Sequence, residues 1–174
     1  SIILLGAIRT VNKDESLEKN LSTLSDTLDE AMEEMRTSVH GIHDDSIDLK
    51  KNILDIISDI PERFSVERDL DIGQDLNGKC VLALIAICRE AVSNIERHSN
   101  GNKIQVTVHE HPGFVSMTIH DNGCVSDATK KMLERNEDTG IGLTNIRNRV
   151  EELNGNVLIS GESGFKIFVT IPKS

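Results

Sequence analysis

Residues 79–94 read KCVLALIAICREAVSN, and this stretch decides the fold. Apolar side chains occupy nearly every position up to Cys88, so a helix over these residues is apolar on almost all of its sides. Such a helix is buried, and we predict that it packs against a sheet. Polar side chains begin at Arg89. Glu90 and Asn94 are four residues apart and therefore point from the same face of the helix.

The segments that follow this helix alternate apolar and polar residues, which is the period of a half-buried strand. Two of them, 104–108 and 115–119, are separated by the turn residues of 111–113, which predicts an antiparallel hairpin. The other predicted segments are an edge strand at 64–72, a loop at 122–139, a helix at 143–153 closed by Asn154 and Gly155, and a last hairpin of 157–160 with 166–171. This order predicts an α+β fold, a two-layer sandwich with helices on one face of a mostly antiparallel sheet.

The segment before Pro61 has a seven-residue periodicity instead. Its apolar positions recur at Leu21, Leu28, Met35, Ile42, Leu49 and Ile56. A sustained repeat of this kind is typical of a helix packed lengthwise against other helices, so we predict one long helix from Leu17 to about Ile57. Residues 10–16 are predicted to be the turn that joins it to a helical stub at 2–9.

These patterns divide the chain into two predicted domains. Residues 1–60 are predicted to be a truncated helical hairpin, and residues 61–174 the α+β domain. Two copies of the hairpin can associate as a four-helix bundle, so we expect a homodimer through these helices.

Composition narrows the class of function. The chain has 174 residues, a formal net charge of −10, four Phe and neither Trp nor Tyr. An acidic chain that lacks aromatic stacking platforms is not expected to bind nucleic acid. The apolar run at 2–8 is too short to span a bilayer, so no direct membrane contact is expected. Three cysteines without C-x-x-C spacing favour a reducing, cytoplasmic location.

Three short motifs could carry chemistry. On the buried helix, Glu90 and Asn94 present a carboxylate and an amide oxygen, which suit a hydroxyl, a water or Mg²⁺. At the end of a predicted strand, Asp121 precedes Gly123, which could let a flat ring approach the backbone. Before the second helix, the Gly-x-Gly sequence TGIGL at 139–143 leaves helix-start amides that favour a phosphate. Each motif alone also has a structural interpretation, as a solvated polar stripe, a turn closing a strand or a glycine-rich loop entering a helix.

In this order, the motifs resemble the N, G1 and G2 boxes of the ATPase superfamily that comprises histidine kinases, gyrase-type topoisomerases, mismatch-repair ATPases and the ninety-kilodalton heat-shock chaperone. The sequences REAVSNIERHS (89–99), IHDNG (119–123) and GIGLTNIRNRVEELNGNV (140–157) are most similar to sensor histidine kinases. The resemblance covers about residues 64–174, and the long helix before them fits the dimerisation region of that family.

The resemblance implies roles for the residues of the first motif. Glu90 matches the polar general-base position of the family, and Asn94 matches its Mg²⁺ ligand. Arg97 and His98 are implied to lie near the phosphates of ATP.

The other two motifs are implied to bind the rest of the nucleotide. Asp121 receives the amino group of adenine and Gly123 lies beside the ring. Gly140, Gly142 and Leu143 are implied to wrap the phosphates.

Residues 124–139 are implied to form a lid over the nucleotide, with Lys130 and Lys131 in it. The sequence departs from the family at one position here. Many members have D-x-G-x-G, whereas Val125 occupies the second glycine position, so the lid hinge is expected to be stiffer or to move to Gly140.

The function implied by the resemblance is histidine autokinase activity, in which the γ-phosphoryl group of ATP passes to a histidine and then to a response regulator. An anti-sigma-type serine kinase is an alternative, because it shares the three boxes without needing a heptad helix. A pseudokinase dimerisation module that senses nucleotide without transferring phosphate is a second alternative.

Two histidines look like candidates for the phosphoacceptor. His43 and Asp44 resemble the His-Asp pair of the family's phosphoacceptor box, and His40 lies one helical turn earlier. The acceptor belongs on the first helix of the hairpin, however, whereas these histidines fall on the helix that leads into the α+β domain. We therefore expect the acceptor to precede Ser1.

Overall fold

A computed structural model describes residues 47–73, 76–135 and 140–173. All of them lie within one compact unit that comprises residues 45–174. The predicted stub at 2–9, the predicted turn at 10–16, His40, His43 and most of the predicted long helix lie outside the described residues.

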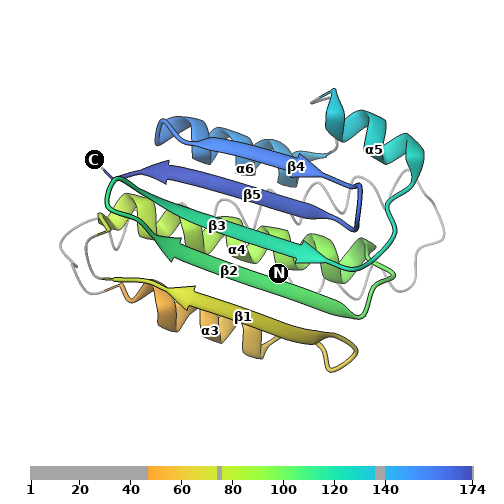
Figure 1. The fold of residues 1–174 in the computed structure, drawn as a ribbon, viewed down its shortest axis with the longest axis horizontal. Coiled ribbons are helices and arrows are strands. Elements are labelled where there is room, and N and C mark those ends of the chain that lie inside the picture. The colour runs from red at the N-terminus through yellow and green to blue at the C-terminus, as the bar shows by residue number, and fades with distance from the viewer. Residues whose placement is uncertain (1–46, 74–75, 136–139, 174) are drawn as a thin grey trace, which may run out of the picture. The chain divides into compact units, whose positions relative to one another are not determined.

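The described residues form an α+β sandwich, as the sequence predicted (Figure 1). Five strands form one sheet in the order β1-β2-β3-β5-β4, in which β1 is parallel to β2 and the other neighbouring strands are antiparallel. The elements are α3 (Leu49–Ser58), β1 (Ser65–Asp71), α4 (Gly78–His98), β2 (Lys103–Glu110), β3 (Phe114–Asp121), α5 (Asp127–Glu134), α6 (Ile141–Glu152), β4 (Asn156–Ser160) and β5 (Lys166–Pro172).

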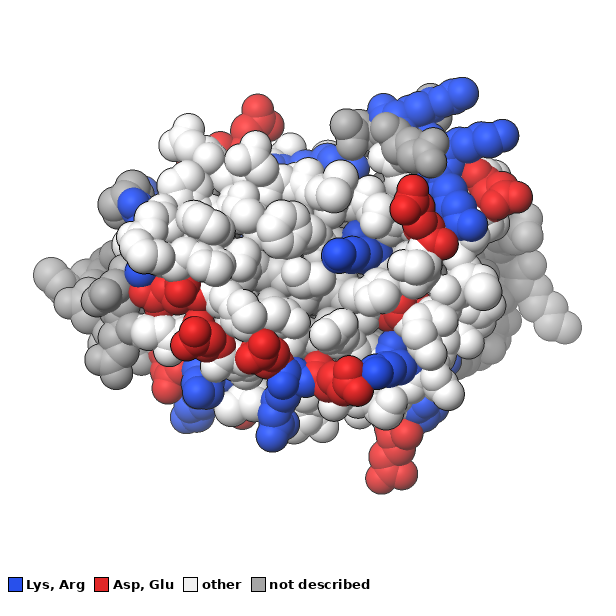
Figure 2. All heavy atoms as spheres, viewed as in Figure 1, with Lys and Arg blue, Asp and Glu red and all other residues white. Residues whose placement is uncertain are grey.

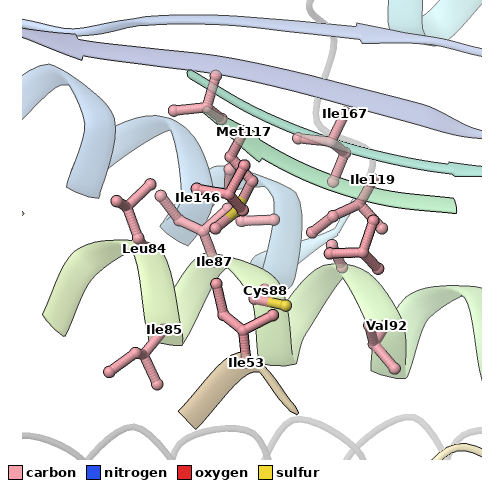
Figure 3. Packing of buried hydrophobic residues seen from close by; sticks show 14 of the residues in the cluster. Ile53, Leu84, Ile85, Ile87, Cys88, Val92, Met117, Ile119, Ile146 and Ile167 are labelled. Atoms are coloured by element: carbon pink, nitrogen blue, oxygen red, sulfur yellow. The ribbon is translucent and has the colours of Figure 1, made fainter. Parts of the chain in front are cut away.

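The core lies between the sheet and the helices α4 and α6 (Figure 3). Alternate residues of β2, β3 and β5 are buried, so the apolar half of each strand faces the helices. Ten residues of α4 are buried, which agrees with the predicted burial of this helix against the sheet. Cys80 and Cys88 are both among them, as expected for core residues. The side chain of Asn77 accepts a hydrogen bond from the Cys80 amide (2.9 Å) and begins the helix.

The predicted continuous helix from Leu17 to about Ile57 is wrong in its last part. Ile47 and Asp48 are not helical, and α3 begins at Leu49. Asp48 is the N-cap, with an extended backbone (φ −75°, ψ 103°) and a carboxylate that accepts from the Lys51 amide at 3.0 Å. The heptad pattern runs through this position because it records only apolar spacing, whereas the Asp48 carboxylate caps the first turn of a helix that begins at Leu49.

The apolar face of α3 packs within the compact unit. Leu49, Ile53 and Ile57 are buried at intervals of four residues, and Ile53 points toward α4 in Figure 3. The compact unit therefore begins at Asp45 and includes α3, although a boundary after residue 60 was predicted. The assignment of residues 1–60 to dimerisation stays a prediction.

Two segments between β3 and β4 are more helical than expected. The predicted loop at 122–139 contains α5, whose N-cap Ser126 accepts a hydrogen bond from the Thr129 amide at 3.2 Å. Helix α6 begins at Ile141, two residues before the predicted start. It ends as predicted, because Asn154 adopts the left-handed conformation (φ 54°) that closes a helix.

No helix of the described segments covers the face of the sheet opposite α4 and α6. Figure 2 shows that this face carries few charged side chains over β3, β5 and β4, whereas charges of both signs line the edge formed by β1. Two side-chain contacts link β1 to β2, an ion pair of Lys103 with Glu67 (2.7 Å) and a hydrogen bond between His109 Nε2 and Asp69 Oδ2 (2.9 Å). Among the helices of the described segments, none is both long and apolar enough to cross a membrane.

Candidate functional site

A cavity of about 470 Å³ opens where α4, the end of β3, α5 and the start of α6 meet. Five residues singled out from the sequence line it, namely Asn94, His98, Asp121, Gly123 and Leu143. The motifs are separated in the sequence, yet the fold places one residue or more from each of them on the same cavity wall. The remaining lining residues are Ile95, Ser99, Cys124, Val125, Ser126, Thr129, Leu133 and Phe165.

Asp121 is the one charged side chain among the buried described residues, with 2% of its surface exposed. Its Oδ1 atom accepts hydrogen bonds from the Ser99 hydroxyl (3.0 Å) and from the Gly123 amide. Its Oδ2 atom is buried and has no hydrogen-bond partner among the described residues. An unpartnered buried acceptor is costly, so this atom is suited to a ligand that donates a hydrogen bond in the cavity.

Glu90 and Asn94 lie on the same face of α4, as their spacing predicted. The Asn94 amide nitrogen donates to Glu90 Oε1 at 3.0 Å, which leaves the Asn94 carbonyl oxygen as the atom that can face a cation. Mg²⁺ prefers such hard oxygen ligands and keeps several waters, so one amide oxygen on the cavity wall fits this ion. No group of three or more His, Cys, Asp or Glu suited to a metal occurs within 47–73, 76–135 and 140–173.

The start of α6 comes very close to the Glu90 side chain. A Cβ atom at Gly142 would lie 2.8 Å from Glu90 Cδ and 3.5 Å from Asn94 Nδ2, so only glycine allows this approach without displacing Glu90. Gly140 is the N-cap of α6 and has φ 114°, a conformation that favours glycine. Because glycine has no side chain to cap the helix, the first amides of α6 are available to an anion.

Four of the predicted site residues do not line the cavity. Glu90 accepts a hydrogen bond from Asn94, which does line the cavity, and Gly142 packs on Glu90. Arg97 turns back along α4, where its Nε donates to the Ser93 carbonyl (3.3 Å) and its guanidinium is 3.8 Å from Glu90 Oε1. Gly140 is exposed at the helix start.

The segment expected to be a lid contributes one wall. The cavity is lined by the N-cap Ser126 and by Thr129 and Leu133 of α5. Lys130 and Lys131 of the same helix do not line it. Val125 is half-buried, and its side chain fills the space in which a Cβ atom of Gly161 would lie, 2.9 Å from Val125 Cγ1. The valine at the second glycine position is thus matched by a glycine on the segment after β4.

Sequence reasoning missed Ser99 and Phe165. Ser99 is the C-cap of α4 and lies 22 residues from the Asp121 that it contacts. Phe165 precedes β5, and its carbonyl accepts from the Asp121 amide at 3.0 Å. Both residues reach the site through the tertiary fold. Ser99 ends the quoted segment REAVSNIERHS (89–99), but no role was assigned to it, and Phe165 belongs to no motif.

Comparisons with known proteins agree with this geometry. Residues 81–174 match the family described as histidine kinase-, DNA gyrase B- and HSP90-like ATPase. The sensor histidine kinase MctS of Rhizobium johnstonii is 28% identical over 169 residues, which are 89% of this chain and 36% of that protein. The sensor protein VraS of Staphylococcus haemolyticus is 27% identical over 187 residues, covering 98% of this chain and 49% of that protein. The chain thus spans about half, or less, of the length of these relatives.

Solved structures show the same fold. The histidine kinase domain of the Erythrobacter litoralis EL346 blue-light activated histidine kinase superposes with a TM-score of 0.62 at 15% identity, over 97% of this chain and 90% of that one. The Acinetobacter baumannii histidine kinase AdeS gives a TM-score of 0.58 at 18% identity, over 98% and 91%. The family match covers more than half of the chain, and the α+β sandwich with its cavity agrees with it. This chain therefore belongs to the histidine kinase-, DNA gyrase B- and HSP90-like ATPase family.

Proposed function

We propose that this chain is the ATP-binding catalytic part of a two-component sensor histidine kinase. In this role it transfers the γ-phosphoryl group of ATP to a histidine, from which the phosphoryl group passes to a response regulator. Family membership and the two sensor-kinase relatives support the proposal. The observation that carries it is the buried Asp121 carboxylate, which lines a cavity of about 470 Å³ and whose Oδ2 has no hydrogen-bond partner among the described residues.

The adenine ring is proposed to bind at Asp121. A neutral adenine presents its 6-amino group as a donor, which satisfies the buried Oδ2 acceptor. Leu143, Ile95 and Phe165 supply apolar walls for a flat ring, and Gly123 has no side chain to obstruct it.

The phosphates are proposed to extend toward the start of α6. The amides after Gly140 and the positive end of the helix dipole favour phosphate oxygens there. Asn94 presents its carbonyl oxygen to Mg²⁺, and Glu90 fixes the orientation of that amide. The ion, when bound, neutralises charge on the phosphate oxygens. Glu90 is proposed to act as the general base, with Arg97 and His98 near the phosphates.

Replacing Asp121 by alanine tests nucleotide binding. We expect Asp121→Ala to weaken ADP binding, measured by isothermal titration calorimetry, by about a hundredfold or more, because the 6-amino group loses its acceptor. The circular dichroism spectrum should remain that of the folded protein. Asp69→Ala is the matched control, since it removes an exposed carboxylate of β1 on the open side of the sheet. Unchanged ADP affinity in Asp121→Ala would contradict the assignment.

The phosphoacceptor is tested separately. Phosphate on histidine is labile to acid, so a longer protein that includes the preceding helix should acquire acid-labile label from γ-labelled ATP. The 174-residue chain is expected to bind ATP with Mg²⁺ yet not label itself. Acid-labile phosphate on His43 would overturn the placement of the acceptor before Ser1. Dimerisation through the helical hairpin belongs to the same proposal and is measured by light scattering of the longer protein.

A further inference from the structure

The Asp121 carboxylate is held from one side only. Both of its hydrogen bonds, from the Ser99 hydroxyl and from the Gly123 amide, end on Oδ1. Oδ2 is buried and has no partner within the described segments. The two oxygen positions are therefore not equivalent, because one accepts two hydrogen bonds and the other accepts none from the described residues.

Ser99 is fixed in turn by its position at the end of α4. Its amide donates to the Ile95 carbonyl at 2.8 Å, which closes the helix. Its hydroxyl oxygen accepts a hydrogen bond from the Gly101 amide at 2.9 Å. Because that amide can only donate, the single hydroxyl proton of Ser99 is directed to Asp121 Oδ1. The Gly101 amide therefore sets the direction of both hydrogen bonds in the series from Gly101 through Ser99 to Asp121.

We propose that Ser99 is a positioning residue that makes the site select 6-aminopurine over 6-oxopurine nucleotides. It does so by holding Asp121 so that a bare acceptor faces the cavity. This inference rests on the proposed nucleotide binding and extends it to the choice of base. A 6-amino group donates to Oδ2, whereas the 6-oxo group of hypoxanthine places a second acceptor against a buried acceptor.

The same geometry fixes the orientation of an asparagine at position 121. Two donors already point at the Oδ1 position, so the amide oxygen of Asp121→Asn must take that place. Its amino group then replaces Oδ2 and presents a donor to the cavity. We therefore expect this nearly isosteric change to reverse the preference, so that inosine diphosphate binds more tightly than ADP.

The test compares ADP with inosine diphosphate, by calorimetry with the full chain. The wild type should bind ADP more tightly. Ser99→Ala should lower the ratio of ADP affinity to inosine diphosphate affinity by about two- to tenfold, the value of one hydrogen bond, mainly by weakening ADP. Ser99→Thr keeps the hydroxyl, and the extended backbone at this position (φ −81°, ψ 137°) suits threonine, so the ratio should be retained.

Asn100→Ala is the matched control, because it tests whether a loosened loop after α4 is by itself enough to change the affinity ratio. It removes the hydrogen bond from the Cys124 amide to Asn100 Oδ1 (2.8 Å) in the same loop, without a bond to the Asp121 carboxylate. Any loss of affinity in this variant should be equal for the two nucleotides.

The outcomes separate the two proposals. A wild type that binds neither nucleotide overturns the proposed function and this inference with it. A wild type that prefers ADP, combined with an unchanged ratio in Ser99→Ala, overturns the role of Ser99 alone. If Ser99→Ala does not fold, Asp121→Asn decides, and a retained preference for ADP in that variant overturns the inference.

Discussion

Gly142 shows at the scale of one residue how close packing protects a catalytic arrangement. The start of α6 rests against Glu90, and the Glu90–Asn94 hydrogen bond lies directly beneath it. A side chain at position 142 has no room unless Glu90 rotates away. The glycine therefore affects the site through Glu90 rather than by contact with the cavity.

We predict that Gly142→Ala separates binding from chemistry. Displacing Glu90 breaks its bond to Asn94, so in the longer protein that includes the preceding helix, phosphoryl transfer from γ-labelled ATP should fall by about ten- to a hundredfold. ADP affinity should fall by a smaller factor than the transfer rate does, since the Asp121 end of the cavity is untouched. Gly78→Ala is the control, because a Cβ atom there meets nothing within 4 Å in the first turn of α4. Equal transfer rates in the two variants would argue against this role of Gly142.

The three cysteines differ sharply in exposure. Burial raises the pKa of the Cys80 thiol to about 11 and that of Cys88 to about 12, from an ordinary value of 9.0, whereas Cys124 is exposed on the cavity wall. At pH 8 the two buried thiols are protonated as well as shielded. We predict that iodoacetamide alkylates one thiol of the native protein rapidly, that Cys124→Ser abolishes this reaction, and that ADP slows it severalfold. Mass spectrometry counts the adducts, and rapid modification of Cys80 or Cys88 would contradict the described core.

Much of the site was predictable at the residue scale because its main polar groups lie in short local motifs. Asn94, Asp121 and Gly123 line the cavity as those motifs suggested. The role of Ser99 was not predictable, because it depends on a contact with Asp121. Only the folded sheet brings the Ser99 hydroxyl to 3.0 Å from Asp121 Oδ1.

Helix α3 is the element whose role changes most between sequence and structure. Its spacing continued the heptad pattern, so it was expected to belong to the dimerisation helix. The structure instead buries Leu49, Ile53 and Ile57 against the core of the α+β unit. Apolar periodicity predicts that a helix has a buried face, but it does not identify the surface that covers this face. The capping residue Asp48 was the local signal that a helix begins at Leu49.

We predict that Ile53→Ala destabilises the α+β unit by about 2–5 kcal/mol, the usual cost of emptying a buried aliphatic site. Ile53 is 0% exposed, so its removal leaves a cavity beside α4. Urea unfolding followed by circular dichroism measures the change. Lys50→Ala, an exposed change on the same helix, should stay within about 0.5 kcal/mol of wild type. If α3 packed elsewhere, the two variants would unfold alike.

At the scale of the whole molecule, the strand and helix order was predictable because the apolar run of α4 and the alternation of the strands are strong local signals. The boundary of the compact unit was not, since it depends on which surface α3 covers. Contacts between α3 and α4 place this boundary at Asp45.

Two shortened proteins test this boundary. A protein of residues 45–174 should melt cooperatively and bind ADP as the full chain does. A protein of residues 61–174 lacks α3 and exposes the apolar side of α4 that Leu49, Ile53 and Ile57 cover, so it should lose several kcal/mol of stability and aggregate. Thermal melts by circular dichroism compare them. Equal melting temperatures would show that α3 is dispensable to the sandwich.

The sheet order also has a consequence for synthesis on the ribosome. Strand β5 follows β4 in the chain but lies between β3 and β4, so until Lys166–Pro172 has left the exit tunnel β4 has no strand partner and β3 is paired only with β2. Until then the nascent chain carries an unpaired β3 edge, of the kind that other chains can pair with. Interrupted translation before this strand therefore yields no nearly finished domain: β5 completes the sheet, and the carbonyl of Phe165 just before it accepts from the Asp121 amide at the cavity wall.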